Sequence, residues 1–203
     1  MTGNMGSGKS IVSAIFNILG IPVYHADLES RKLFENNNIK VLIRDAFGSG
    51  VFTGNGEIDR KILARIVFSD AVKLNTLNSI LHPLVKENFR EWVDRQCYSP
   101  YIIHEAAIIF ESGFQCEFDR IVHVACPKEI AIARVIERDH AERKDILKRM
   151  QFQMDDDRKA TLSDFVIRND GTEMLIPQVL AIHQSLSENS AEHVQDIPAE
   201  ITD

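Results

Sequence analysis

The segment from Gly3 to Ser10 constrains this chain most, because its letters GNMGSGKS match the pattern G-x-x-x-x-G-K-[ST] in full. Glycines allow the backbone to turn successive N–H groups toward one bound anion. The helix expected from Ser10 points the positive end of its dipole to the same place. We therefore expect a phosphate-binding loop, with Lys9 on the β- and γ-phosphates and the Ser10 hydroxyl on Mg²⁺. The expected nucleotide contacts are Asn4, Met5, Gly6, Ser7, Gly8, Lys9 and Ser10.

A loop of this kind normally follows a buried central strand, but only Met1 and Thr2 precede Gly3. We therefore expect the anchoring strand to be missing and the sheet to have a gap. The chain would then either start upstream of Met1 or be truncated.

Short β-rich runs alternate with helical stretches along the rest of the chain. This alternation predicts a parallel sheet covered by helices on both faces, so the expected fold class is α/β with three layers. His82-Pro83 is expected to interrupt the helical stretch that starts near Leu74 and resumes at Leu84. The run Asn36-Asn37-Asn38 is expected to end the helix at 28–34. Strands are expected at 21–24, 101–104, 120–125 and 164–168, and helices at 10–19, 28–34, 60–68, 74–81, 84–97, 127–138, 142–159 and 176–186.

Composition narrows the classes of function. The 203 residues are 44% hydrophobic and 26% charged, and no apolar run approaches the ~20 residues of a membrane-spanning helix. The formal net charge is -7, so we expect no basic face that binds nucleic acid. After Arg168 the charged residues are all Asp or Glu, so we expect a solvated acidic tail. Three scattered cysteines and the lack of a signal peptide favour a reducing cytoplasm. We expect a monomer or small homo-oligomer that binds no membrane.

Asp27 follows the second predicted strand, and ligands of a parallel sheet bind at the carboxyl ends of its strands. Its carboxylate can orient an acceptor hydroxyl and take its proton, or it can simply cap the following helix. Residues 134–159 are rich in Arg and Lys, as in a lid whose cations meet the transferring phosphoryl group on closure. Arg138, and after it Arg149, is the expected lid ligand, while most of the others are expected to form surface ion pairs. The chain has no N-K-x-D guanine motif, which favours a small-molecule kinase over a GTPase.

Several segments, in this order between Thr2 and Leu186, resemble dephospho-CoA kinases: TGNMGSGKS, LGIPVYHADLESRKL, LHPLV, HEAAIIFESG, RVIERD and SDFVIRNDG. The resemblance implies ATP-dependent phosphorylation of the 3′-hydroxyl of dephospho-CoA, the last step of coenzyme A synthesis. It also implies a kinase core at 1–37 and 99–186 with a lid at 134–160, a helical CoA-binding insertion at 38–98 and an acidic tail at 187–203. The residues themselves leave open another small-molecule kinase of nucleotides or nucleosides, or a nucleotide-binding protein without catalysis.

The same resemblance assigns roles to single residues. It implies that Asp27 is the catalytic base and that Glu105 holds Mg²⁺ through water. Lys9, from the loop motif, and Arg138, from the predicted lid, are expected to assist the transfer. Asn169 is placed like the adenine-side loop of related kinases, although a plain turn is the alternative. Substrate contacts are expected from Arg31, Arg60, Arg65, His82 and Arg149.

Two positions depart from the family pattern and two histidines are expected to be structural. His25 stands where many members have an acid, and Ala107 replaces a common proline. His104 and His123 lie in predicted strands, and Trp92 is expected in the core or in a wall of the insertion.

Overall fold

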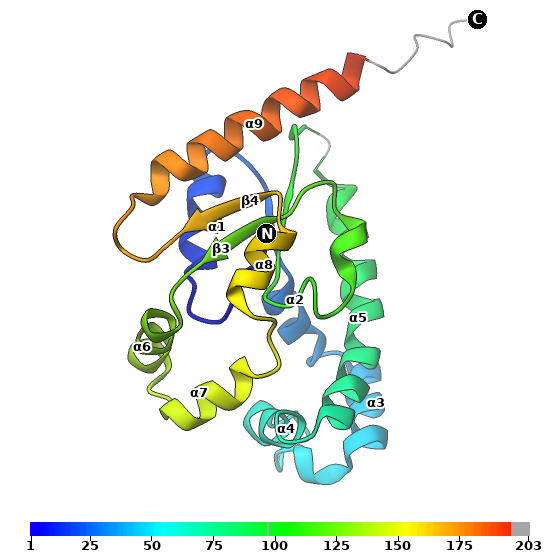
Figure 1. The fold of residues 1–203 in the computed structure, drawn as a ribbon. Helices are drawn as coiled ribbons and strands as arrows, with labels where there is room; N and C mark the ends of the chain where they lie inside the picture. Colours follow the sequence, from blue (N-terminus) through cyan, green and yellow to red (C-terminus); the bar gives the residue numbers. More distant parts are fainter. Residues whose placement is uncertain (97, 196–203) are drawn as a thin grey trace, which may run out of the picture.

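The computed structural model describes residues 1–96 and 98–195, which form short parallel strands surrounded by helices (Figure 1). The strands are β1 (Val23–His25), β2 (Ile103–Glu105), β3 (Val122–Ala125) and β4 (Phe165–Arg168). The helices are α1 (Lys9–Ile18), α2 (Ala26–Leu33), α3 (Asn37–Phe47), α4 (Arg60–Val67), α5 (Ala71–Val93), α6 (Lys128–Asp139), α7 (Arg143–Met150), α8 (Asp156–Leu162) and α9 (Leu175–Gln195), with 3-10 turns η1 (Ser49–Val51) and η2 (Phe114–Glu117).

The strands form two parallel pairs that Met1 and Thr2 connect. β1 pairs with β2, and β3 pairs with β4. The Thr2 N–H donates to the Val122 carbonyl at 2.8 Å, and the Val124 N–H donates to the Thr2 carbonyl at 2.8 Å. On the other side, the Ala106 N–H donates to the Met1 carbonyl at 3.1 Å. The gap expected before the loop is therefore bridged by two residues in place of a full strand.

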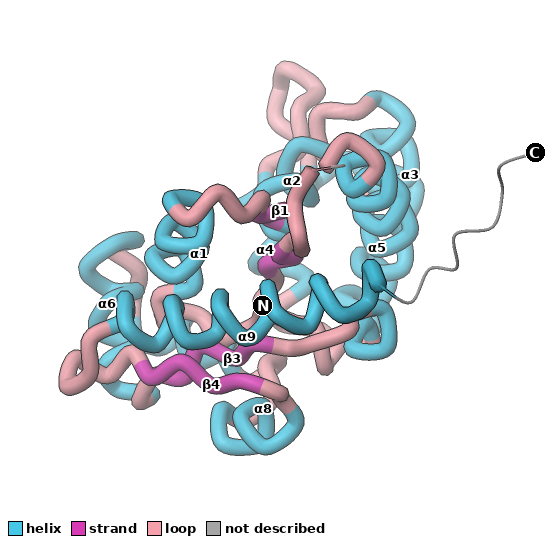
Figure 2. Tube along the Cα trace, turned by 90° about the horizontal axis from the view of Figure 1, so that it is seen from above, coloured by secondary structure: helices cyan, strands magenta, loops and turns pink. Residues whose placement is uncertain are grey.

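Helices lie on both sides of β3 and β4. α1 packs against α9, α9 against β4 and α8 against β3. Seen from above, α1 and α9 lie on one side of these strands and α8 on the other (Figure 2). The main hydrophobic cluster lies between the strands and the helices α1 and α9, and it includes the fully buried Val12 and Phe16 of α1, Val124 of β3 and Ile167 of β4. This burial fixes the start of α1, and with it the loop at residues 3–8.

The helices α3, α4 and α5 surround a second hydrophobic cluster. Its buried residues include Ile43, Leu63, Val67 and Leu77. α5 also packs against α2, so this helical part adjoins the segment that carries Asp27. These helices thus form a hydrophobic cluster of their own beside the strands.

Two expectations about helices were wrong. α5 runs without interruption through Pro83, because the packing of Leu77 and Leu81 before it and of Val85 and Phe89 after it outweighs one lost backbone hydrogen bond. The three asparagines near residue 37, expected only to end a helix, start α3: the Asn36 side chain accepts a hydrogen bond from the Asn38 N–H at 2.9 Å.

The carboxyl-terminal part and the cysteines complete the description. α9 extends to Gln195, into the segment expected to be a tail, while residues 196–203 and Cys97 lie outside the described residues.

Cys116 and Cys126 are free thiols. Within the described residues, no helix has the length and hydropathy needed to cross a bilayer.

Candidate active site

The loop between Met1–Thr2 and α1 has the geometry that its glycines were expected to provide. Gly6 and Gly8 have φ angles of 82° and 92°, a region that disfavours other residues. A Cβ atom on Gly6 would lie 2.2 Å from the Ala131 carbonyl oxygen, and one on Gly8 would lie 2.1 Å from Asn169 Nδ2. Lys9 starts α1 and donates from Nζ to the Gly3 carbonyl at 2.9 Å. The loop therefore requires glycine at positions 6 and 8. The Lys9 side chain folds back along the loop to reach the Gly3 carbonyl.

Asn169 and Arg134 hold this loop against the core. Asn169 is buried and donates from Nδ2 to the Ser7 carbonyl at 2.7 Å. Arg134 in α6 donates to the Asn169 carbonyl at 3.1 Å and to its Oδ1 at 3.4 Å. Asn169 thus has a positioning role that the sequence did not suggest. Arg134 belongs to the stretch rich in Arg and Lys at 134–159, and no local pattern indicates a partner so distant in the chain.

The segment after α7 rests on the loop from the other side. The Met5 N–H donates to Gln153 Oε1 at 3.0 Å, and Asn4 Nδ2 donates to the Met154 carbonyl at 3.2 Å. The Met154 N–H in turn donates to Glu111 at 2.6 Å. The predicted lid is therefore joined directly to the phosphate-binding loop.

Glu105 lies at the end of β2, beside the loop, and is buried. Its Oε1 is 3.8 Å from Lys9 Nζ, and its Oε2 is 2.9 Å from Nδ1 of His25. The family resemblance implied that Glu105 lies near Mg²⁺, and the structure places Glu105 beside Lys9. The sequence did not suggest the contact between Glu105 and His25. This contact arises because the register of β1 and β2 sets His25 opposite Glu105.

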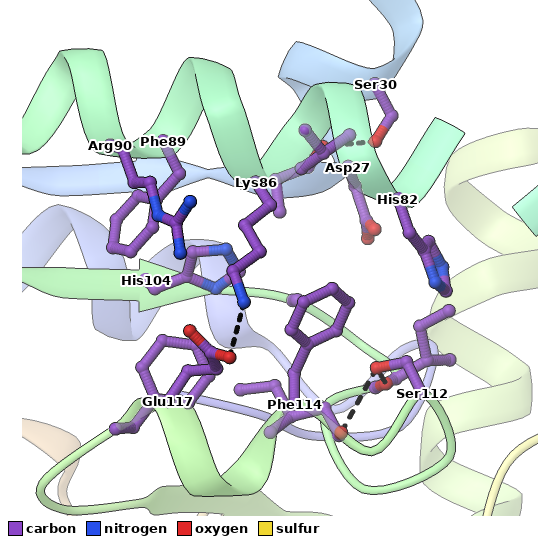
Figure 3. Close-up of a pocket in the computed structure, with 16 residues that line it drawn as sticks. Asp27, Ser30, His82, Lys86, Phe89, Arg90, His104, Ser112, Phe114 and Glu117 are labelled. Carbon is purple, nitrogen blue, oxygen red and sulfur yellow. Dashed lines mark hydrogen bonds and ion pairs between the residues drawn. The ribbon is translucent and has the colours of Figure 1, made fainter. Parts of the chain in front are cut away.

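Asp27 lies in the first turn of α2 and lines a cavity (Figure 3). The helix begins at Ala26 and its N-cap residue is His25, so the alternative role of Asp27 as a cap is not observed. The protein atoms packed around Asp27 raise the pKa of its carboxyl above the ordinary value, although the positive charges of Lys9, Arg31 and Arg149 lower it. The expected base and the loop lysine therefore share one electrostatic environment.

The two lid arginines differ in their surroundings. Arg138 is exposed and forms a bidentate pair with Asp139 at 2.7 and 2.8 Å. Arg149 is half-buried over the ring of Phe68, and desolvation lowers the pKa of its guanidinium. The positive charge of Arg149 lowers the pKa of Asp27, and Arg138 is not among the groups that shift it.

The remaining predicted residues lie around this centre. Ser10 is exposed in the first turn of α1, and Arg31 is exposed near the end of α2. Arg60 and Arg65 are exposed on α4, and no described contact connects them to the loop. His82 lines the cavity at Asp27, edge-on to Phe114 with ring centroids 5.4 Å apart.

Comparison with known proteins identifies the family. The family model described as dephospho-CoA kinase matches residues 1–174. The chain belongs to the dephospho-CoA kinase family. A dephospho-CoA kinase of Bacteroides fragilis is 40% identical over 183 residues, which cover 90% of this chain and 89% of that protein. One from Idiomarina loihiensis is 33% identical and covers 91% of this chain and 92% of its own.

Solved structures agree with this family. The crystal structure of TT1252 from Thermus thermophilus has a TM-score of 0.81 and 31% sequence identity, and it covers 91% of this chain and 94% of its own. A dephospho-CoA kinase from Campylobacter jejuni, 24% identical with a TM-score of 0.64, supports the fold alone, over 93% of this chain and 96% of its own. Family membership confirms the expected ATP-dependent phosphorylation of dephospho-CoA in coenzyme A biosynthesis. It favours this function over a kinase of other nucleotides or a binding protein without catalysis.

Proposed function

We propose that this dephospho-CoA kinase has the three-layer architecture of phosphate-loop kinases and transfers the γ-phosphoryl group of ATP with Asp27 as the base at the 3′-hydroxyl. One observation carries the proposal: Asp27 follows β1, which pairs in parallel with β2, and Glu105 at the end of β2 lies 3.8 Å from the loop residue Lys9. A carboxyl with a raised pKa is a stronger base than an ordinary one, which suits it to accept the hydroxyl proton as the new P–O bond forms.

The loop fits the phosphates of ATP. The positive φ angles of Gly6 and Gly8 let the loop turn successive backbone N–H groups toward one anion at the start of α1. The Ser7 hydroxyl and Asn4 Oδ1 are buried and have no hydrogen-bond partner among the described residues. Lys9, on the rim of the loop, supplies the positive charge for the terminal phosphates.

The residues near the loop also fit Mg²⁺ bound through the nucleotide. The described residues contain no cluster of three or more His, Cys, Asp or Glu side chains suited to a metal, and Mg²⁺ in kinases relies mainly on phosphate oxygens and waters. Ser10 would ligate it directly and Glu105 through water. When bound, the ion neutralises charge on the transferring phosphoryl group.

Cations from α2 and from the lid complete the proposed site. The positive charges of Arg31 and Arg149 both lower the pKa of Asp27, which supports placing them near the proposed base. Arg138 would have to leave Asp139 to reach the phosphates, which requires the lid at 134–160 to move. Arg60, Arg65 and His82 are proposed for the acceptor side, in the insertion at 38–98. The free thiols of Cys116 and Cys126 support a reducing, cytoplasmic setting.

A coupled assay of ADP release tests the proposal. Dephospho-CoA, nucleoside monophosphates, a nucleoside and shikimate are compared as acceptors, each with MgATP. Turnover that depends on dephospho-CoA, together with 3′-phosphorylated product in mass spectrometry, is the expected result. Faster turnover of another acceptor, or ATP binding without turnover of any acceptor, would refute the proposed function.

A further inference from the structure

The end of α7 contacts the turn that follows α4 (Figure 1). Arg149 lies in the last turn of α7, and its Cζ atom is 5.7 Å from the centroid of the Phe68 ring. The ring of Phe152, three residues further on, has its centroid 6.0 Å from that of Phe68. One ring at the end of α4 therefore contacts two side chains of the predicted lid, and the transfer chemistry above gives it no role.

Phe68 is held in a rigid turn. It is the C-cap residue of α4, and its N–H donates to the Ala64 carbonyl at 2.9 Å. The preceding Val67 is buried in the hydrophobic cluster of α3, α4 and α5, and the Asp70 side chain caps the start of α5. A ring fixed by its own backbone in this way can position a flexible partner, because its place does not depend on that partner.

The ring holds Arg149 without a carboxylate. Among the salt bridges of the described residues, Arg138 pairs with Asp139 but none includes Arg149. An aromatic face attracts a guanidinium through the ring quadrupole and leaves the N–H groups at its edge to an anion. Arg149 thus keeps the charge that a phosphoryl group requires, while the contact with Phe68 restrains its position.

Arg149 is also close enough to the proposed base to affect it, since its positive charge lowers the pKa of Asp27. A free arginine side chain loses rotamer freedom when it reaches a phosphate, so an arginine that is already restrained there lowers the barrier to transfer further. We propose that Phe68 is a positioning residue that holds Arg149 in place for phosphoryl transfer, an inference that rests on the proposed function.

The chain contains a second pair of the same kind, which serves as a matched control. The Cζ atom of Arg44 in α3 lies 4.7 Å from the centroid of the Phe52 ring. Phe52 and Phe68 both pack against the hydrophobic cluster of α3, α4 and α5. Equal changes at the two rings therefore disturb the same cluster and remove the same kind of contact, but only the change at Phe68 affects a proposed lid cation.

Two kinds of substitution separate positioning from packing. Phe68→Leu removes the ring and keeps an apolar side chain. Trifluorophenylalanine at position 68, introduced by nonsense suppression, keeps the ring but withdraws negative charge from its face, so it weakens the attraction to a cation. The same two changes are made at Phe52. The readouts are kcat and the KM values for ATP and dephospho-CoA, with thermal melting as a check on the fold.

We expect F68L to lower kcat about fivefold to twentyfold with both KM values little changed, and the fluorinated ring at position 68 to lower kcat by a smaller factor. In the Arg149→Ala background, F68L should cause no further loss, because the two side chains act as one unit. Both changes at Phe52 should leave kcat at the wild-type value.

Several results would overturn the role of Phe68. These are a kcat of F68L at or above that of wild type, losses from F68L and R149A that multiply in the double variant, and a fluorinated ring at position 68 that leaves kcat unchanged, which would indicate packing alone. If F68L does not fold, the fluorinated variant decides. An unchanged kcat in R149A would remove Arg149 from the proposed site, and the role of Phe68 with it. Lack of wild-type turnover with dephospho-CoA would refute the proposed function itself.

Discussion

Glu105 contacts two basic side chains through different oxygens: His25 lies 2.9 Å from Oε2, and Lys9 lies 3.8 Å from Oε1. His25 thus orients the Glu105 carboxylate, which borders the phosphate-binding loop. Many family members have an acid at the position of His25.

Loss of the His25 contact should weaken Mg²⁺ use. In His25→Leu, Glu105 loses the partner on Oε2, so the Mg²⁺ concentration for half-maximal activity at saturating ATP should rise severalfold. His183→Leu is the control, since His183 bonds Tyr101. An unchanged Mg²⁺ dependence in H25L would separate His25 from the metal site.

Asp27→Asn should abolish most of the turnover. The amide cannot accept the hydroxyl proton, so kcat should fall about 10²–10⁴-fold, while the dissociation constant for ATP stays close to that of wild type. Glu29→Gln, an acid on the same helix that pairs with Lys32, should keep its activity. Rapid-quench kinetics and calorimetric ATP titration give the two quantities. A kcat near that of wild type would remove Asp27 from its role as base.

The same substitution should stabilise the fold at neutral pH. The raised pKa of Asp27 means that the folded protein holds this proton more tightly than the unfolded chain does. Ionisation of Asp27 therefore costs stability above the raised pKa, and this cost disappears as the pH falls below the ordinary carboxyl pKa of about 3.9. D27N should melt at a higher temperature than wild type at pH 7, with a difference that shrinks as the pH decreases. The opposite trend in differential scanning fluorimetry would contradict the raised pKa.

Gly8→Ala should impair both folding and ATP binding. Its φ of 92° costs an L-residue ~1–2 kcal/mol, and the new Cβ would also collide with Asn169. Gly171→Ala is the matched control, because Gly171 has a φ of 88° but no atom within 4 Å of its added Cβ. Chemical denaturation should show a larger loss for G8A than for G171A, and only G8A should lose ATP affinity. Equal losses would indicate that Asn169 moves away at no cost.

The two lid arginines should contribute unequally. Arg149→Ala should lower kcat about 10²–10³-fold, as for the loss of one preorganised cation at a developing negative charge. Arg138→Ala should cause a smaller loss, because Arg138 must first leave Asp139. Arg143→Ala, which removes an exposed partner of Glu129, serves as the control. The reverse order in steady-state kinetics would make Arg138 the principal lid ligand.

Local patterns predicted the parts of this site that depend on neighbouring residues. The loop from Gly3 to Ser10 and the helix after it follow from eight consecutive letters and from the spacing of apolar residues. By contrast, the bond from Asn169 to Ser7 and the contact of His25 with Glu105 join residues 162 and 80 positions apart, so no local pattern contains them. The path of α5 through Pro83 could not be predicted either, because tertiary packing overrode the local preference.

The Met5 N–H, part of the phosphate-binding loop, already donates a hydrogen bond to Gln153 in the segment after α7. In the proposed mechanism the Met5 N–H binds a phosphate oxygen, which would take the place of Gln153 Oε1 at that donor. The bond from the Met154 N–H to Glu111 would not be broken by this step. The nucleotide and the segment after α7 would therefore compete for one backbone N–H.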